Sequence, residues 1–283
     1  MKADTILRAA KLVREKKPLV QCITNDVTVN DCANIVLAAG ASPIMADEQR
    51  EAADVARIAD ALEINLGKSS ESSTAASLIS AKIASGRGIP IVIDPVGAGC
   101  IKRRLDFALY LLSSYHIAAV RGNMSEIKAL CGAESLEKGV DASASDAVTK
   151  TNAAEAAKVP AALARKYGCT VAATGKTDIV TDGKTVYALS NGDGMMGMVT
   201  GTGCMSSALM GAYCGAGDDI LPACLASTAV MGVCGELAAK YAKSLGKGTG
   251  TFKTALFDEI STLAEDALQD TLKVSDITEY VFK

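Results

Sequence analysis

The residues best suited to chemistry in this chain are five small or polar residues in a row, Thr200 to Cys204 (TGTGC). Gly201 and Gly203 permit the backbone angles of a tight turn, and the apolar run after Cys204 has helical character. Unpaired N–H groups at a helix start, together with the positive end of the helix dipole, bind anions. The sequence therefore predicts an anion hole for a phosphate or a transferring phosphoryl group, formed by the backbone amides of four residues: Gly201, Thr202, Gly203 and Cys204.

The thiol of Cys204 falls in the first turn of the predicted helix, where a thiol pKa can drop below its free value of about 8.5. This position favours a base beside a phosphoryl-transfer centre. A glycine turn followed by an inert buried cysteine explains the same pattern, because free cysteine often packs as a small hydrophobe. The residues alone leave both interpretations open.

Two further polar segments follow apolar runs that read as strands. Asp94 follows Ile91 to Ile93 and leads into a glycine-rich loop, which suits a Mg²⁺ contact through water or a simple turn before Pro95. Arg121 follows a second apolar run and can fork onto phosphate oxygens. Glu126 stands three residues after Asn123, a spacing that also predicts a capping box.

Three more turns end predicted strands on what would be the ligand-binding edge of a parallel sheet. Thr174 and Gly175 form a small polar turn that can approach a nucleotide. Asn25 and Met45 follow the first two predicted strands and can line a small, partly apolar pocket.

Two sequence patterns resemble nucleotide motifs but lack the required context. The GDGMMG of positions 192–197 matches GxGxxG, yet a second glycine turn follows it where a dinucleotide fingerprint needs a helix. The GKT at 175–177 and the GKS at 67–69 lack the earlier glycine of a P-loop, because Thr170 and Leu62 occupy that position. Any handling of ATP must therefore use other residues.

Short apolar strands alternate with amphipathic helices, a pattern that predicts a parallel sheet covered on both faces. The expected strands are 19–23, 43–45, 61–66, 89–94, 117–120, 170–174, 179–182 and 185–189. The expected helices are 3–16, 30–39, 51–59, 71–86, 102–113, 124–131, 152–167, 202–214, 219–243 and 250–268. The polar interval 133–152 reads as a surface loop, and no linker divides the chain, so we expect a single domain over residues 1–283.

Composition excludes several classes of function. The net charge of −3, with acids and bases interspersed, does not suit a nucleic-acid binder. No uninterrupted apolar run has the length of a membrane span, so no membrane partner is expected. Nine scattered cysteines without a CxxC pair favour a reducing cytoplasm, and we interpret the ten-residue spacing of the last four as coincidence.

Taken together, these segments resemble the hydroxyethylthiazole kinase family of the ribokinase-like superfamily. The resemblance covers residues 20 to about 210, and its motifs stand in the family's order. They are QCITN from position 21, GASPIMAD from 40, DPVGAG from 94, VRGNMSE from 120 with KGVD from 138, and VTGTGC from 199.

The resemblance implies a three-layer α/β/α ribokinase-like fold with a central, mostly parallel sheet and no lid domain. It implies transfer of the γ-phosphate of ATP, with Mg²⁺, to the hydroxyl of 4-methyl-5-(2-hydroxyethyl)thiazole, a salvage step of thiamine biosynthesis. Members are commonly homotrimers with thiazole sites at subunit boundaries.

The family's site residues carry over position by position. The resemblance places thiazole contacts at Met45 and Gly201, with pocket neighbours at Asn25 and Gly67. It places ATP contacts at Arg121 and Thr174, and the Mg²⁺ and phosphate water network at Asp94 and Glu126. Cys204 stands where the wider superfamily usually has an aspartate base.

Two departures from the family pattern remain. Gln21 replaces a frequent histidine and is expected to alter a pocket edge, and the glycine- and methionine-rich loop 191–198 is expected to loosen the segment before the anion hole. Other functions stay open from the residues alone. They are a kinase for hydroxymethylpyrimidine or pyridoxal, a nucleotide-dependent dehydratase of the same superfamily, and a non-catalytic nucleotide sensor.

Overall fold

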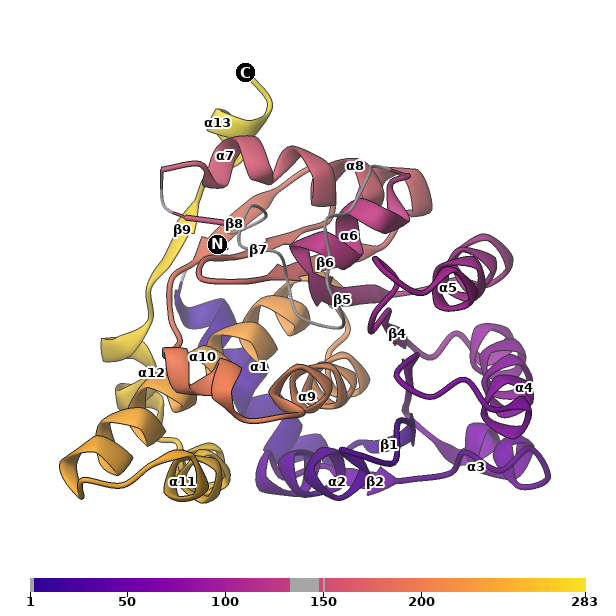
Figure 1. Cartoon of the computed structure of the whole chain (residues 1–283), viewed down its shortest axis with the longest axis horizontal. Helices are drawn as coiled ribbons and strands as arrows, with labels where there is room; N and C mark the ends of the chain where they lie inside the picture. Colours follow the sequence, from indigo (N-terminus) through magenta and orange to yellow (C-terminus); the bar gives the residue numbers. More distant parts are fainter. Residues whose placement is uncertain (1–2, 133–147, 150) are drawn as a thin grey trace.

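A computed structural model describes residues 3–132, 148–149 and 151–283 (Figure 1). The strands are β1 Leu19–Ile23, β2 Ser42–Ile44, β3 Ala61–Asn65, β4 Ile91–Asp94, β5 Ala119–Asn123, β6 Thr170–Thr174, β7 Asp178–Thr181, β8 Val186–Leu189 and β9 Val274–Asp276. The helices through residue 167 are α1 Ala3–Lys16, α2 Val29–Ala38, α3 Ala52–Ile58, α4 Glu71–Arg87, α5 Lys102–Ser114, α6 Met124–Leu130, α7 Ala153–Ala156 and α8 Lys158–Tyr167. A 3₁₀ turn, η2 Gly194–Met198, precedes α9 Thr202–Ala216, α10 Ile220–Ser244, α11 Thr249–Thr262, α12 Glu265–Thr271 and α13 Thr278–Val281.

All nine described strands form one sheet in the order β2-β1-β3-β4-β5-β6-β7-β8-β9. The strands from β2 to β6 pair in parallel, and β6 to β9 pair antiparallel. This arrangement confirms the predicted α/β class and the mostly parallel sheet. The register sets Asn65 beside Asp94 and Asn123 beside Thr174, so polar residues at the strand ends meet at one edge.

Helices cover both faces of the sheet (Figure 1). One face packs against α9 and α10, with α1, α2 and α11 outside them, and the other packs against α3, α4, α6 and α8. Successive side chains of a strand point to opposite faces of the sheet. In β3, Ala61 packs in the hydrophobic core on the α9 face, whereas Leu62 and Ile64 pack in the core on the other face. The small residues of α9 allow close approach, since a Cβ at Gly211 would lie 3.2 Å from Val20 Cγ1.

The structure departs from the expected elements mainly near the C-terminus. The expected helix 250–268 is two helices, α11 and α12, with a break at residues 263–264. Strand β9 and helix α13 were not expected, because a three-residue polar strand is specified by its pairing with β8 rather than by local pattern. Nearly all of the expected surface loop 133–152, and the KGVD motif within it, lies outside the described residues.

Two of the regularly spaced cysteines meet in the fold. Cys214 and Cys224 have their sulfur atoms 3.8 Å apart across the turn between α9 and α10. They meet because α9 and α10 pack against each other on either side of a short turn, and periodicity within one helix does not predict that. All nine cysteines are free thiols.

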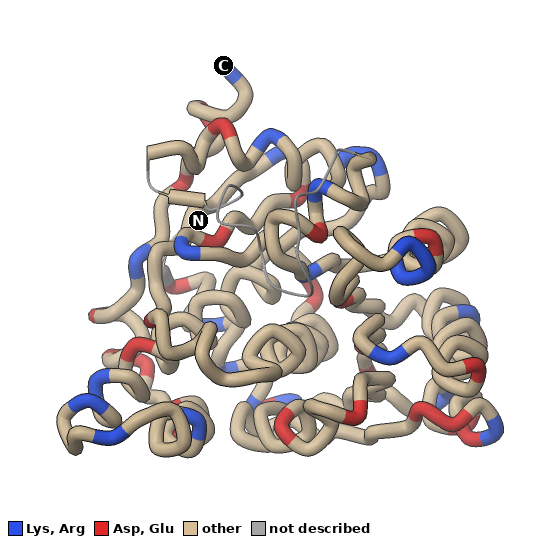
Figure 2. The backbone as a smooth tube through the Cα atoms, viewed as in Figure 1, with Lys and Arg blue, Asp and Glu red and all other residues tan. Residues whose placement is uncertain are grey.

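Helix α10 is long and apolar enough to pass for a membrane span by length and composition, but 72% of its most apolar window is buried inside the fold. It contacts α9, α11, α1 and the strands β6 and β7. Charged residues of both signs are interspersed along the backbone (Figure 2).

Candidate active site

A cleft of about 890 Å³ opens at the carboxyl ends of the parallel strands, between the sheet and the start of α9. Ten of the eleven site residues that the sequence predicts line it: Asn25, Gly67, Asp94, Arg121, Glu126, Thr174, Gly201, Thr202, Gly203 and Cys204. The exception is Met45, which follows β2 and packs partly buried against the core. Residues from six segments distant in sequence therefore converge on one cavity.

The predicted anion hole sits where the turn meets α9. Gly201 is the residue before the helix, with a φ of +89°, and its carbonyl accepts the amide of Met205 at 2.8 Å. The amides of residues 201–204 donate no hydrogen bond to any described residue. A side chain at Gly201 would meet Thr28, because an added Cβ would lie 2.5 Å from Thr28 Cγ2. Both the backbone angle and the space therefore require glycine here.

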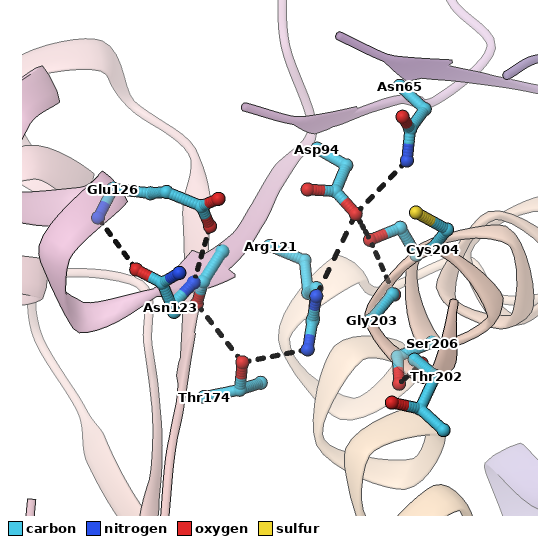
Figure 3. Close-up of polar contacts among 12 residues, drawn as sticks. Asn65, Asp94, Arg121, Asn123, Glu126, Thr174, Thr202, Gly203, Cys204 and Ser206 are labelled. Atoms are coloured by element: carbon cyan, nitrogen blue, oxygen red, sulfur yellow. Dashed lines mark hydrogen bonds and ion pairs between the residues drawn. The ribbon is translucent and has the colours of Figure 1, made fainter. Parts of the chain in front are cut away.

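Arg121 extends from β5 toward this helix start (Figure 3). Its Nη2 donates to Thr174 Oγ1 at 2.8 Å, and its Nη1 lies 3.7 Å from Asp94 Oδ2. A Cβ at Gly203 would lie 2.8 Å from Arg121 Nη1, so the second glycine admits the guanidinium beside the anion hole. The Nε of Arg121 is buried and has no partner among the described residues. The arrangement presents a fixed cation next to unpaired amides, which suits phosphate oxygens.

Asp94 uses one carboxylate oxygen and leaves the other free (Figure 3). Its Oδ2 accepts Ser207 Oγ at 2.6 Å and Asn65 Nδ2 at 3.3 Å, in addition to the contact with Arg121. Its Oδ1 is buried without a partner among the described residues. Burial raises the pKa of Asp94, and Arg121 and Ser207 oppose that shift. An oriented, unsatisfied carboxylate oxygen at the floor of a cleft fits a cation or its bound water.

Glu126 completes the capping box that its spacing predicts. Its Oε2 accepts the amide of Asn123 at 2.7 Å while Asn123 Oδ1 accepts the amide of Glu126 at 2.8 Å, and its Oε1 accepts the amide of Gly97 at 2.9 Å. Each Glu126 oxygen therefore already holds a backbone amide, and Glu126 also joins α6 to the loop after β4. A contact with a metal would have to run through water.

Burial, and secondarily the Asp94 carboxylate, raises the pKa of Glu126 to about 8. Between its ordinary pKa and that value the folded protein keeps this proton while the unfolded chain releases it. Stability of the metal-free protein should therefore fall as pH rises through that window, by up to about 1.4 kcal/mol per pH unit. Glu126→Gln should flatten this slope, and losing one amide acceptor should cost about 1–3 kcal/mol. Unfolding free energies in urea from about pH 5 to 8 test this, and an unchanged slope contradicts it.

Cys204 lies in the first turn of α9, as predicted, but its pKa moves the opposite way. Burial, and secondarily the Asp94 carboxylate, raises the pKa of the Cys204 thiol. Asn25 Nδ2 lies 3.3 Å from the sulfur and donates to it. The expectation of a lowered pKa is wrong because desolvation of this 9% exposed residue outweighs the helix dipole. Cys204 is therefore a thiol at neutral pH in the free protein.

Asn25 and Gly67 line the other side of the cleft. Asn25 Nδ2 also reaches Asn65 Oδ1 at 3.2 Å, and the same oxygen accepts the amide of Gly67 at 2.9 Å. Gln21 does not line the cleft: its Nε2 contacts Ala46 O at 3.3 Å and Ser80 Oγ at 3.0 Å on the opposite face of the sheet. Its influence is therefore on the end of β2 and not on the cleft wall.

The loop 191–198 is anchored, contrary to the expected loosening. Asn191 Oδ1 accepts the amide of Lys273 at 2.7 Å, and the Asp193 carboxylate pairs with Lys243 at 2.6 Å. The Met196 side chain fills the space above Gly235, where a Cβ would lie 2.6 Å from its sulfur. These contacts tie the loop to α10 and to the segment before β9.

The sequence did not point to several residues that shape the cleft. Asn65 and Ser207 orient Asp94, yet each lies in an ordinary strand or helix pattern. Asp178 lines the cleft at the start of β7, accepts the amide of Gly175 at 2.8 Å, and has a pKa raised to about 7 by burial. Part of α10 also lines the cleft, through Ser227, Thr228, Met231 and Gly232. Only the fold decides which face of such an apolar helix meets the ligand.

Comparison with known proteins agrees with the family resemblance of the sequence motifs. A sequence profile of the Hydroxyethylthiazole kinase family matches residues 10–266. A protein named hydroxyethylthiazole kinase from Clostridium beijerinckii is 49% identical over 265 residues, which are 94% of this chain and 95% of that protein. The solved structure of a hydroxyethylthiazole kinase protein from Pyrococcus horikoshii OT3 superposes with a TM-score of 0.84 at 36% identity, covering 96% of this chain and 99% of that one.

A more distant likeness concerns the fold alone. The pyridoxal kinase from Staphylococcus aureus, solved in complex with pyridoxal, superposes with a TM-score of 0.56 at 16% identity. The match covers 78% of this chain and 88% of that one. The two proteins therefore share the arrangement of the sheet and its covering helices.

Proposed function

This chain belongs to the hydroxyethylthiazole kinase family, and from that premise we propose how its cleft carries out the reaction. The protein is a kinase that uses ATP to phosphorylate the hydroxyl of a hydroxyethylthiazole in thiamine salvage. Our proposal assigns the transfer to the region where the amides of residues 201–204, Arg121 and Asp94 face one another. The observation that carries it is the set of four amides at the start of α9 that have no partner among the described residues, beside a fixed guanidinium.

In this proposal the transferring group sits on the anion hole and the nucleotide phosphates lie along Arg121 and Thr174. Phosphoryl transfer depends chiefly on alignment and on neutralising charge. The amides act as preorganised donors, and the Arg121 guanidinium stabilises charge on the phosphate oxygens. Thr174 fixes the orientation of the Arg121 guanidinium by accepting the 2.8 Å hydrogen bond from its Nη2.

We assign the Mg²⁺ contact to Asp94, because its Oδ1 is buried and lacks a partner in the described part of the chain. Ser207 and Asn65 hold the other oxygen and fix the carboxylate plane. Glu126 would contribute through water. Bound Mg²⁺ would supply positive charge to the ATP phosphates.

For the acceptor, we propose that the thiazole alcohol lies between Asn25, Gly67 and Gly201, with its hydroxyl near Cys204. Met45 lies outside the cleft of its own chain, which fits a homotrimer whose thiazole sites lie between subunits. Val27, which lines the cleft, is 74% exposed, and Met198, between the lining residues Gly197 and Val199, is 70% exposed; both also fit such a boundary. Sedimentation of the purified protein tests the trimer. The nine free thiols fit a cytoplasmic location.

ATP consumption against a panel of alcohols tests the proposed acceptor. We expect turnover with 4-methyl-5-(2-hydroxyethyl)thiazole, and a rate at least about 100-fold lower with hydroxymethylpyrimidine or pyridoxal. Formation of the phosphorylated thiazole should match ADP release mole for mole. Faster turnover of another alcohol would contradict the proposed acceptor, and phosphate release without a phosphorylated alcohol would contradict the transfer.

The contribution of Cys204 is expected to be modest, because a thiol with a raised pKa is rarely ionised at neutral pH and a loose transition state releases the hydroxyl proton late. Cys204→Ala should lower kcat by about tenfold or less, below the usual range for a general base. Cys204→Asp should keep or raise kcat. Steady-state kinetics at saturating ATP measure both variants. Wild-type turnover in Cys204→Ala would remove the base role, and a loss beyond about 100-fold would make it essential.

A further inference from the structure

A second cavity of about 260 Å³ lies away from the cleft, among α1, α9, α10 and the junction of α11 and α12. Most of its wall is aliphatic. The lining comprises Leu7, Ala10, Lys11, Arg14, Ala39, Tyr213, Val230, Ile260, Leu263, Ala264, Glu265 and Leu268. An engineered apolar cavity of about 150 Å³ holds benzene, so this volume suits a ring or branched chain with one small substituent.

The phenol of Tyr213 provides a hydrogen-bond donor in this mostly aliphatic wall. Tyr213 is 4% exposed and lines the cavity, and no hydrogen bond joins its hydroxyl to another described residue. Burial raises the pKa of the phenol well above its ordinary value, so the hydroxyl keeps its proton and remains a donor. A hydroxyl donor on the cavity wall can bond an acceptor of a ligand held in the cavity.

Arg14 adds a cation that the fold holds in place. Its Nη2 donates to Ile260 O at 2.6 Å and its Nη1 to Ser261 O at 2.9 Å, at the C-terminal end of α11. Its stem packs on Gly40, where an added Cβ would lie 3.2 Å from Arg14 Cγ. Both arginine contacts are with neutral carbonyls, so the guanidinium charge has no carboxylate partner among the described residues. It lines the same cavity as the Tyr213 phenol.

Two more charged residues line the cavity. Lys11 is a second cation, whose ammonium also lies 3.7 Å from Glu15, and Glu265 is a carboxylate. Because Glu15 pairs with Lys11, Arg14 is the lining cation without a carboxylate partner among the described residues, and one such cation near Glu265 favours a ligand with a single negative charge over a dianion. The aliphatic wall requires the rest of that ligand to be apolar.

We propose that this second cavity is a binding site for a small monocarboxylate with an apolar body, whose carboxylate accepts from the Tyr213 hydroxyl and faces Arg14. The apolar body lies among Val230, Ile260 and Leu263. Both α9 and α10 also line the cleft, through Met210 and Met231, but the two cavities have no lining residue in common. The proposal is therefore independent of the kinase chemistry.

Phenylacetate is the probe, and phenylacetamide is its neutral counterpart of nearly equal shape. Titrations of protein with ¹³C-labelled methyl groups, in the presence of saturating ADP, should show shifts at Leu7, Val230, Ile260 and Leu263. Tyr213→Phe removes one oxygen and should weaken phenylacetate binding by about tenfold. Arg14→Met should weaken it by at least as much, and phenylacetamide should bind wild-type protein at least about tenfold more weakly than phenylacetate.

Several outcomes would overturn the proposal. Equal affinity of wild-type protein and Tyr213→Phe would remove the phenol contact. Displacement of phenylacetate by ADP, or methyl shifts confined to Met210 and Met231, would move the probe into the cleft. Because Arg14→Met also loses two carbonyl contacts, its unfolding transition is measured in parallel. If Arg14→Met is unfolded, Tyr213→Phe alone decides the outcome.

Discussion

Replacing Gly201 with valine is expected to lower kcat by about 10²–10³-fold. The substituted residue must either leave the φ of +89° or push Thr28 away, because its Cβ would lie 2.5 Å from Thr28 Cγ2. Either movement turns the amides of residues 201–204 away from the anion-binding position that they share. Loss of one well-placed donor for a transition-state oxygen usually has an effect of this size.

A matched control separates this effect from backbone strain. Gly88 also has a positive φ, +70°, at the end of α4, and an added Cβ there would meet no atom within 4 Å. Gly88→Val should lose stability through the same unfavourable backbone angle, by about 1–2 kcal/mol, while keeping kcat. A Gly201→Val enzyme that is folded and turns over like wild type would show that the anion hole does not act in the reaction.

Replacing Arg121 with methionine should produce the second large effect, a fall in kcat/KM for ATP of about 10³-fold. The guanidinium lies directly beside the amides of residues 201–204, since a Cβ on Gly203 would lie 2.8 Å from Nη1. Removing it leaves Asp94 without its cation and Thr174 Oγ1 without its 2.8 Å donor. Arg121→Lys keeps the charge but cannot donate two parallel hydrogen bonds as a guanidinium does, so its kcat/KM for ATP should lie between those of wild type and Arg121→Met.

The exposed Arg103, on α5, provides the control, since Arg103→Met changes the net charge equally. Arg103→Met should keep wild-type kinetics. Steady-state rates at varied ATP and fixed thiazole alcohol measure each variant. A loss of less than about tenfold in Arg121→Met would show that the phosphates lie elsewhere.

The sequence predicted the alternating elements well where local pattern decides them. Strands 19–23 and 170–174 match β1 and β6, and the turn at Gly201 begins α9 as expected. These segments carry their own signals: apolar runs, breaking residues and glycines. Strand β9 carries none, because its three residues are ordered by hydrogen bonds to β8 across the chain.

Within the site, the sequence predicted which residues lie together. It predicted their protonation and their orienting contacts less reliably. Strand ends of a parallel sheet share an edge, so Asp94, Arg121 and Thr174 had to approach one another. The raised pKa of Cys204 could not be predicted, since it depends on burial and on the nearby Asp94 carboxylate. The orienting role of Ser207 depends on the rotation of α9 against β4, which no local pattern specifies.

A crystal structure with ADP, aluminium fluoride, Mg²⁺ and the thiazole alcohol tests the central claim most directly. We predict the fluoroaluminate group within about 3 Å of the backbone nitrogens of residues 201–204, with the Arg121 guanidinium on its fluorines. The alcohol oxygen should lie on the side of Cys204. A fluoroaluminate group bound elsewhere in the cleft, with those four amides facing protein carbonyls or water, would contradict the account.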